Sequence, residues 1–367
     1  MEKNPAVIST SPDMPAAQVP AYPRNCWWVA ATVAEVQTRP IGRRILEEPI
    51  VLYRKADGEV VALEDRCAHR WAPLSLGRVV GNDIVCGYHG FRYAADGRCV
   101  HVPTQSAIPP RAKVRAYRAV ERKPFVWIWT GDERRIDNVP LPPVLEWVED
   151  PAWLVVQGGY LLEAGYMALK ENVLDLTHFA YVHAKTFQIM DYLGPPSVRV
   201  DGQRISYRQE FSDMPLPALY GEPTGIGQER PVTRVNEGAF VSPAMQEATV
   251  IISDAAAAPG QRDRFEVKIV HMTTPITPTK TMYWWVRGQD FGHRPGMKDD
   301  LQRVVESAFA EDKVILEATQ TLIDTDPRHR NSPEINVLAD QAGRQIRRVV
   351  SDMIRQETEQ RRLSVSH

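Results

Sequence analysis

The sequence has 367 residues, of which 43% are hydrophobic and 25% are charged, and this balance excludes disorder for the bulk of the chain. Its 44 basic and 46 acidic residues leave a formal net charge of −2, which gives no electrostatic signal for binding nucleic acid or an anionic membrane surface. No window approaches the roughly 18 consecutive apolar residues of a membrane span. Because domains typically hold about 100–200 residues, we expect two of them.

Residues 1–23 are proline-rich and lack a continuous apolar core, so they predict a flexible arm rather than a secretory signal. The four cysteines of the chain are too few for a disulfide scaffold. We therefore expect a reducing, cytoplasmic location, in which clustered cysteine and histidine side chains more often bind a metal than form disulfides.

Residues 24–136 consist of short runs of β-forming residues separated by turn signals. Asp-Gly pairs at 57–58 and 96–97 lie between apolar runs and are typical of hairpins. These features predict an all-β domain, either a small sandwich or a barrel. The proline-rich stretch 137–151 predicts a linker at the start of a second domain, residues 137–367.

The second region combines helix and strand patterns. A helical pattern covers residues 165–182, and two helical segments, near 299–323 and 336–361, close the chain. Between them lie strand-like runs, at 196–210, 247–253, 264–274 and 280–287. Strands grouped between helices indicate an α+β fold with an antiparallel sheet.

Two loops between predicted strands each offer one cysteine and one histidine. Cys67-Ala-His69 is followed, after sixteen intervening residues, by Cys86-Gly-Tyr-His89. Zinc fingers usually pair two cysteines in one loop and two histidines in another, whereas both loops here are mixed. This arrangement suits a [2Fe–2S] cluster in which two cysteines bind one iron and two histidines bind the other. A structural zinc site is the alternative.

A second cluster lies at Asn172-Val-Leu-Asp175-Leu-Thr-His178, with His183 five residues further on. On a continuous helix Asn172, Asp175 and His178 share one face. His183 would then lie roughly 140° away, so both histidines can reach one metal only if the helix ends or distorts near Tyr181. Two imidazoles and a carboxylate with open positions form the facial triad of non-haem Fe(II) oxygenases. A structural role for the histidine pair is the alternative.

The third ligand is sought on the long helix that follows the strands. Its apolar residues recur at helical spacing, namely at Leu301, Val304, Val305, Ala308, Phe309, Ile315, Leu316, Leu322 and Ile323. The apolar face centres within roughly 20° of Asp312, whereas Glu306 and Glu317 lie on the opposite side and Glu311 lies at the edge. Because an unpaired buried carboxylate is costly, Asp312 is expected to face a cation.

The whole pattern resembles the oxygenase component of the Rieske non-haem iron oxygenases. The mixed Cys/His loops resemble the Rieske motif, and Asn-x-x-Asp-x-x-His-x-x-x-x-His and the Glu311-Asp312-Lys segment are similar to the family's mononuclear iron sequences. The resemblance spans about residues 27–320 and is closest to aromatic O- and N-dealkylating monooxygenases, vanillate and dicamba demethylases among them. It implies an N-terminal Rieske domain, a helix-grip-like catalytic domain and a head-to-tail homotrimer.

The resemblance also implies roles for single residues. Asp175 is expected to link His178 to His89 of the partner subunit and so to carry electrons across the interface, and Asn172 belongs to the same motif. A capping or surface role is the alternative for Asp175. His271 aligns with a segment that contributes a substrate-contacting histidine in similar demethylases, and an ordinary strand histidine is the alternative there.

Nucleotide-binding motifs are missing, since no Gly-x-Gly-x-x-Gly follows a strand and no Walker-type loop occurs. A separate ferredoxin or flavin reductase is therefore expected to supply electrons to the cluster, from which they pass to an iron that activates O2 beside a small aromatic substrate. The expected reaction hydroxylates an N- or O-alkyl carbon and releases an aldehyde. An arene cis-dihydroxylating dioxygenase and an electron-transfer protein with a structural second domain are the competing hypotheses.

The sequence gives only an indirect indication of the substrate. Carboxylate substrates usually require a buried arginine or a hydrogen-bonding cluster. Because no arginine stands out in an apolar run of the predicted pocket strands, the sequence favours a neutral or amide-bearing aromatic, with methoxybenzoates second.

Overall fold

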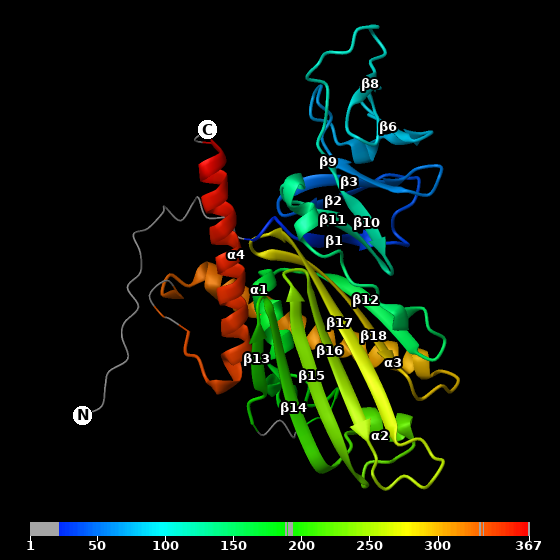
Figure 1. Cartoon of the computed structure of the whole chain (residues 1–367), viewed down its shortest axis with the longest axis vertical. Helices are drawn as coiled ribbons and strands as arrows, with labels where there is room; N and C mark the ends of the chain where they lie inside the picture. Colours follow the sequence, from blue (N-terminus) through cyan, green and yellow to red (C-terminus); the bar gives the residue numbers. More distant parts are fainter. Residues whose placement is uncertain (1–21, 188, 190–193, 330–331, 333, 366–367) are drawn as a thin grey trace, which may run out of the picture.

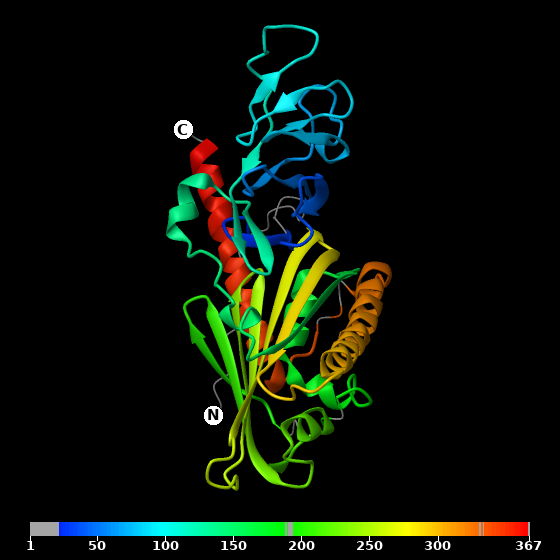
Figure 2. The same cartoon turned by 90° about the vertical axis from the view of Figure 1, so that its right-hand side faces the viewer.

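The computed structural model describes residues 22–187, 189, 194–329, 332 and 334–365. Almost all of the expected flexible arm therefore lies outside the described residues. The described chain has short β-strands up to residue 129 and then one large antiparallel sheet with helices, which confirms the α+β class. Figures 1 and 2 show the β-rich N-terminal part at one end of the large sheet. No helix in the described chain is long and apolar enough to cross a bilayer.

Up to residue 129 the strands form three small antiparallel sheets. The first sheet consists of β1 (Trp27–Thr32), β11 (Phe125–Trp129) and β10 (Ala119–Arg122). The second consists of β2 (Ile41–Ile45), β3 (Glu48–Arg54), β4 (Val60–Glu64) and β9 (Ala116–Tyr117). The third consists of β5 (Arg78–Val80), β6 (Asp83–Val85), β7 (Arg92–Tyr93) and β8 (Cys99–His101). The apolar runs seen in the sequence form the core of this part, and every residue of β11 is buried.

The large sheet has the strand order β12-β18-β17-β16-β15-β14-β13, and every neighbouring pair is antiparallel. Its strands are β12 (Leu154–Leu162), β13 (Ser197–Asp201), β14 (Arg204–Pro215), β15 (Pro231–Ser242), β16 (Met245–Ser253), β17 (Arg264–Thr277) and β18 (Lys280–Gln289). The four strand-like runs of the sequence correspond to five of these strands. Two strands, β12 and β15, were not predicted.

Glycines inside β12 and β15 interrupt the patterns by which strands are predicted. A β-carbon on Gly158 would lie 2.5 Å from the ring of Trp285, and one on Gly238 would lie 2.6 Å from the ring of Tyr207. Each glycine is the register partner of that aromatic residue on the neighbouring strand. The missing side chains therefore make room for large rings that lie across the sheet, which propensity alone does not reveal.

Helices connect and cover the sheet. They are α1 (Tyr166–Leu174), α2 (Ala218–Thr224), α3 (Met297–Thr325) and α4 (Gln341–Val365), with 3₁₀ turns η2 (Leu74–Leu76), η3 (Glu133–Asn138), η4 (Glu146–Val148), η5 (Leu176–Ala180) and η7 (Leu338–Asp340). The helix α3 buries Val305 and Phe309 against aromatic residues of β18. The predicted apolar stripe is wrong at Ile315 and Leu322, which are 50% and 65% exposed. Ile315 lies beside the buried face of α3, and Leu322 lies beyond Leu316, the last buried residue of the helix.

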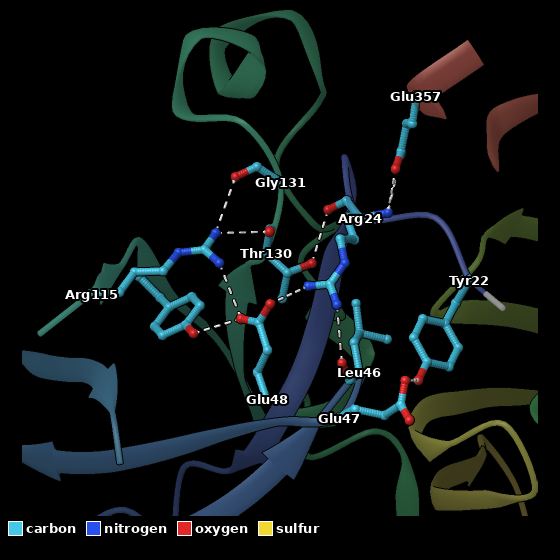
Figure 3. Close-up of polar contacts among 10 residues, drawn as sticks. Tyr22, Arg24, Leu46, Glu47, Glu48, Arg115, Thr130, Gly131 and Glu357 are labelled. Atoms are coloured by element: carbon cyan, nitrogen blue, oxygen red, sulfur yellow. Dashed lines mark hydrogen bonds and ion pairs between the residues drawn. The ribbon is translucent and has the colours of Figure 1, made fainter. Parts of the chain in front are cut away.

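A polar network ties α4 to the N-terminal part. Glu48 of β3 accepts hydrogen bonds from the Tyr117 hydroxyl (2.6 Å) and from Arg115 Nη1 (3.1 Å), and it forms an ion pair with Arg24. The backbone N–H of Arg24 donates to Glu357 of α4 at 2.8 Å, as Figure 3 shows. The C-terminal helix is thereby fixed to the same edge of the molecule as the start of the described chain.

Candidate metal centres and substrate cavity

Cys67 and Cys86 lie in two loops of the same shape. Each cysteine N–H donates to the carbonyl oxygen five residues further on, at 2.9 Å and 2.8 Å. Each cysteine carbonyl accepts from the N–H four residues further on, which belongs to Trp71 (3.0 Å) and Gly90 (3.1 Å). Trp71 and Gly90 both adopt the left-handed conformation, with φ of 62° and 73°. Glycine adopts this conformation readily, but tryptophan does so rarely, so residue type predicts the turn at Gly90 and not the one at Trp71.

The four predicted cluster residues converge at the tips of these loops. Cys67 and Cys86 are buried and free of disulfides, whereas His69 and His89 are exposed, with ring centroids 4.6 Å apart. The Tyr93 hydroxyl lies 3.2 Å from Cys67 Sγ, a contact of the kind that tunes the potential of an iron–sulfur cluster. Two buried thiols and two exposed imidazoles from matched loops fit the donor set of a Rieske [2Fe–2S] cluster.

The helix that leads to the second centre is broken. α1 ends at Leu174 because Asp175 takes an extended conformation (φ −102°, ψ 97°). Its carboxylate accepts hydrogen bonds from the N–H of Thr177 (2.9 Å) and from its hydroxyl (2.6 Å), and so caps η5. The continuous helix predicted over 165–182 is therefore wrong. The distortion expected near Tyr181 is confirmed, since η5 ends there.

These breaks bring His178, His183 and Asp312 together. Their ligand atoms all lie within 4.8 Å of one another. Nε2 of His178 lies 3.4 Å from Asp312 Oδ1, Nε2 of His183 lies 3.3 Å from the same oxygen, and Asn172 Nδ2 donates to it at 3.0 Å. Nε2 of His178 is buried and has no hydrogen-bond partner in the described part of the chain. Two imidazole nitrogens and one carboxylate oxygen that face one point fit a facial triad for Fe(II).

The opposite ring nitrogens of the two histidines are held by neighbouring groups. His183 Nδ1 lies 2.9 Å from Glu311 Oε2, and Glu311 also accepts a hydrogen bond from the Thr186 hydroxyl at 2.5 Å. His178 Nδ1 contacts the carbonyl oxygen of Asp175. Bonds of this kind fix the tautomer and leave Nε2 for a metal. The sequence placed Glu311 only at the edge of the apolar face of the helix and did not predict that it supports His183.

Burial has different consequences for the three histidines of the site. It lowers the pKa of His178. It also lowers that of His183, but hydrogen bonds and charge from Asp312 and Glu311 outweigh it, and the net shift of the pKa is upward. Burial lowers the pKa of His271 to about 4, so its imidazole is neutral at pH 7.

The triad forms part of the wall of a cavity of about 830 Å³. The remaining wall is mostly apolar and includes Leu169, Val173, Phe179, Leu219, Ile269 and Phe309. His271 of β17 lines the same cavity, is 6% exposed, and places its Nδ1 2.7 Å from the Tyr283 hydroxyl. A lining of this kind suits a small, largely apolar molecule.

Arg287 of β18 also lines the cavity, which corrects the expectation that no arginine stands out in the predicted pocket strands. Its side chain is 3% exposed. Because side chains alternate along a strand, Arg287 shares a face with Tyr283 and Trp285, and this alternation was the signal that could have found it. Tyr220 and Asn236, also absent from the predicted site, complete this part of the wall.

Mixed Cys/His loops in a β domain and a His/His/Asp triad that opens to a cavity define a Rieske-type non-haem iron oxygenase. The Rieske [2Fe-2S] domain model matches residues 26–118, and the model of the vanillate O-demethylase oxygenase C-terminal domain matches residues 162–356. The chain belongs to the Rieske non-haem iron oxygenases, among the oxygenase components of the vanillate O-demethylase type.

Relatives and solved structures agree with this membership. The chain is 32% identical to the vanillate O-demethylase oxygenase subunit of Pseudomonas sp. (strain HR199 / DSM 7063), over 92% of this chain and 96% of the relative. It is 28% identical to the chloroacetanilide N-alkylformylase oxygenase component of Rhizorhabdus wittichii, over 94% and 99%. The crystal structure of dicamba monooxygenase bound to 3,6-dichlorosalicylic acid superimposes with a TM-score of 0.80, at 29% identity, and covers 91% of this chain and 98% of that one.

These findings decide between the competing classes. The chain is a monooxygenase component whose cofactors are one Rieske [2Fe–2S] cluster and one mononuclear iron. The second domain is an oxygenase domain, so the hypothesis of an electron-transfer protein with a structural second domain is wrong. The relatives include oxygenase components of a vanillate O-demethylase, a dicamba O-demethylase and a chloroacetanilide N-alkylformylase, which supports dealkylation over ring dihydroxylation.

Proposed function

We propose that this chain is the terminal oxygenase of a multicomponent system that removes an O- or N-linked alkyl group from a small aromatic compound, with O2 and with electrons from a separate ferredoxin or flavin reductase. The observation that carries the proposal is the opening of the His178, His183 and Asp312 side chains onto a mostly apolar cavity of about 830 Å³. The names of the relatives, which remove O- and N-linked groups from aromatic compounds, support it.

The proposed ligands are Cys67, His69, Cys86 and His89 for the cluster and His178, His183 and Asp312 for the iron. When bound, the cluster supplies single electrons and the iron supplies O2 activation for hydroxylation of the alkyl carbon. The protein's own residues position the reactants. The apolar wall excludes water, Asn172 holds Asp312, and the neutral His271, held by Tyr283, is placed to offer a hydrogen bond to the substrate.

Electron transfer is proposed to run between subunits of a head-to-tail homotrimer. Figures 1 and 2 show the sheet β5–β8, beside the cluster loops, at the end of the molecule far from α1 and α3. His89 is exposed there, and Asp175 lines an open groove together with Arg344 and Arg347. The proposal is that Asp175 links His178 to His89 of the partner subunit.

The subunit proposal is tested by co-expressing Cys86→Ser and His183→Ala chains, each of which is inactive alone. Transfer between subunits predicts that mixed trimers recover a substantial fraction of turnover, because an intact cluster then faces an intact iron site across an interface. Transfer within one chain predicts no recovery, since no single chain carries both centres.

We further propose the division into an arm (1–23), a Rieske domain (24–136) and a catalytic domain (137–367), and a cytoplasmic location. The matched family models fall inside the two proposed domains. The four cysteines are free, which supports a reducing compartment.

The reaction is tested with purified holoenzyme, a surrogate reductase and 18O2, on methoxy- and N-alkyl-aromatic compounds. The expected products are one aldehyde and one dealkylated arene per turnover. A cis-diol with both oxygen atoms on the ring would overturn the proposal in favour of a dioxygenase.

A further inference from the structure

Arg287 carries a positive charge into a cavity wall that is otherwise mostly apolar. The side chain is 3% exposed, and its Nη1 donates to Gln289 Oε1 at 2.9 Å. Its Nη2 is buried and has no hydrogen-bond partner among the described residues, which also offer it no ion pair. A buried guanidinium without a counter-ion is costly, so its retention calls for a ligand that compensates the charge.

Gln289 fixes the orientation of the guanidinium. Its Nε2 donates to the carbonyl oxygen of Phe291 at 3.1 Å, which turns its Oε1 toward Arg287 Nη1. One side of the guanidinium is thereby occupied, whereas Nη2 is a donor without a partner among the described residues, on a side chain that lines the cavity. Burial lowers the pKa of Arg287 to about 10, so the group keeps its charge at pH 7.

Arg287 and the triad stand at different parts of the cavity wall. In the sheet register His271 of β17 lies opposite Trp285 of β18, and Arg287 lies two residues further along β18 than Trp285. Two residues along a strand correspond to about 7 Å. Tyr220 of α2 also contributes to the cavity wall. The cavity wall therefore has a metal-binding part and a cationic part in addition to apolar side chains such as Leu219.

We propose that Arg287 binds an oxyanion, a carboxylate or a sulfonate, carried by the aromatic substrate. An arginine recognises such groups through two parallel N–H donors or one charge-assisted bond, and either form fixes the direction of the ring. The alkyl group then points toward His178, His183 and Asp312. This inference rests on the proposed function and reverses the preference for neutral substrates that the sequence suggested. Gln289 acts as a positioning residue for Arg287.

The test measures binding to the holoenzyme without turnover, by calorimetry under anaerobic conditions. The probes are 2-, 3- and 4-methoxybenzoate and toluene-4-sulfonate, each against its matched amide. The wild type is expected to prefer the best acid over its amide by about ten- to a hundredfold, the usual effect of a charge-assisted hydrogen bond. Arg287→Gln is expected to abolish this preference and Arg287→Lys to keep part of it, with metal content and Rieske EPR signal unchanged.

Arg234→Gln is the matched control. Arg234 is also a buried arginine of the same sheet, at 2% exposure, but it packs 4.6 Å from the Phe211 ring centroid and is not part of the cavity wall. Its substitution should leave the acid preference intact. If Arg287→Gln fails to fold, the wild type and Arg287→Lys still decide the question, because a wild type without acid preference overturns the anion site.

The results separate this inference from the proposed function. Acid preference that depends on Arg287, without aldehyde release from any probe, supports the anion site and contradicts dealkylation. The anion site is contradicted if acids and amides bind equally, or if neither binds, while neutral compounds release an aldehyde. That result leaves the proposal of dealkylation in place. An acid preference that survives in Arg287→Gln also overturns the assignment.

Discussion

The two candidate metal centres are built in opposite ways. The cluster loops come from one stretch of chain, are shaped by backbone turns, and present His69 and His89 to solvent while both cysteines are buried. The iron site joins residues from α3 and from the segment after α1, 129 positions apart between His183 and Asp312, and is oriented by side-chain hydrogen bonds. An exposed imidazole edge suits exchange of electrons with another protein, whereas a buried triad suits chemistry from which water is excluded.

This contrast predicts that the two centres can be removed independently. His183→Ala should lose the mononuclear iron and reduce turnover by at least about a hundredfold, because an iron ligand is gone rather than merely reoriented. The Rieske EPR signal should persist, since the cluster loops share no contact with this side chain. Iron analysis and EPR on the same sample measure both effects.

Cys86→Ser is the complementary variant to His183→Ala, and it should lose the cluster while the mononuclear iron remains. His69→Cys should lower the potential of any surviving cluster, because an anionic ligand replaces a neutral one. Loss of both centres in His183→Ala would show that the two sites fold as one unit, contrary to the comparison.

Asp175 is proposed to connect the iron site with the cluster of the partner subunit. Its carboxylate already caps η5 through Thr177, so a purely structural role is the competing explanation. Asn is as good an N-cap as Asp, so Asp175→Asn keeps the cap and removes the charge. We expect turnover to fall by about ten- to a hundredfold while the iron content and the proposed trimer persist. Wild-type turnover in this variant would leave the cap as the whole role of Asp175.

Glu311→Gln tests how strongly the iron site depends on the groups behind its histidines. His183 Nδ1 loses a carboxylate partner at 2.9 Å, although the amide can still accept the hydrogen bond. Apparent iron affinity is expected to fall about tenfold, at the low end of the effect of such partners. Titration with Fe(II) of the metal-free protein measures it, and Glu306→Gln on the opposite face of α3 is the control. Equal iron affinities in Glu311→Gln and Glu306→Gln would show that Glu311 does not support iron binding through His183.

Features of the sites that depend on local sequence could be predicted, whereas features that depend on tertiary packing could not. The Cys67-x-His69 and Cys86-x-x-His89 spacings lie within single loops, and a carboxylate centred in an apolar stripe pointed to Asp312, which is 5% exposed in the structure. The break at Asp175 could not be predicted, because a cap competes with helix continuation only once the following turn exists.

Neighbouring strands explain the remaining failures. Gly158 interrupts the strand pattern of β12 in the sequence, and this strand was not predicted for that reason. In the structure the ring of Trp285 on the neighbouring strand fills the space beside Gly158. Arg287 resembles the polar end of an apolar run. Alternation along β18 places it on the face of Tyr283 and Trp285, but the register with β17 is needed to show that this face lines the cavity of His271. Such information lies in tertiary contacts rather than in propensity.

Lys170 gives the last prediction, which concerns stability and not the metal sites. It is fully buried on α1, its Nζ has no hydrogen-bond partner in the described chain, and burial lowers its pKa to about 7. Between pH 7 and the ordinary pKa of 10.5 the unfolded chain holds a proton that the folded chain lacks, so this residue makes stability rise with pH by at most about 1.4 kcal/mol per unit. Below pH 7 its full cost is present. Lys170→Met should therefore raise the melting temperature at pH 7 and abolish the contribution of this residue to the increase of stability with pH. Equal pH profiles of unfolding in both proteins would mean that the charge of Lys170 is compensated in the folded state.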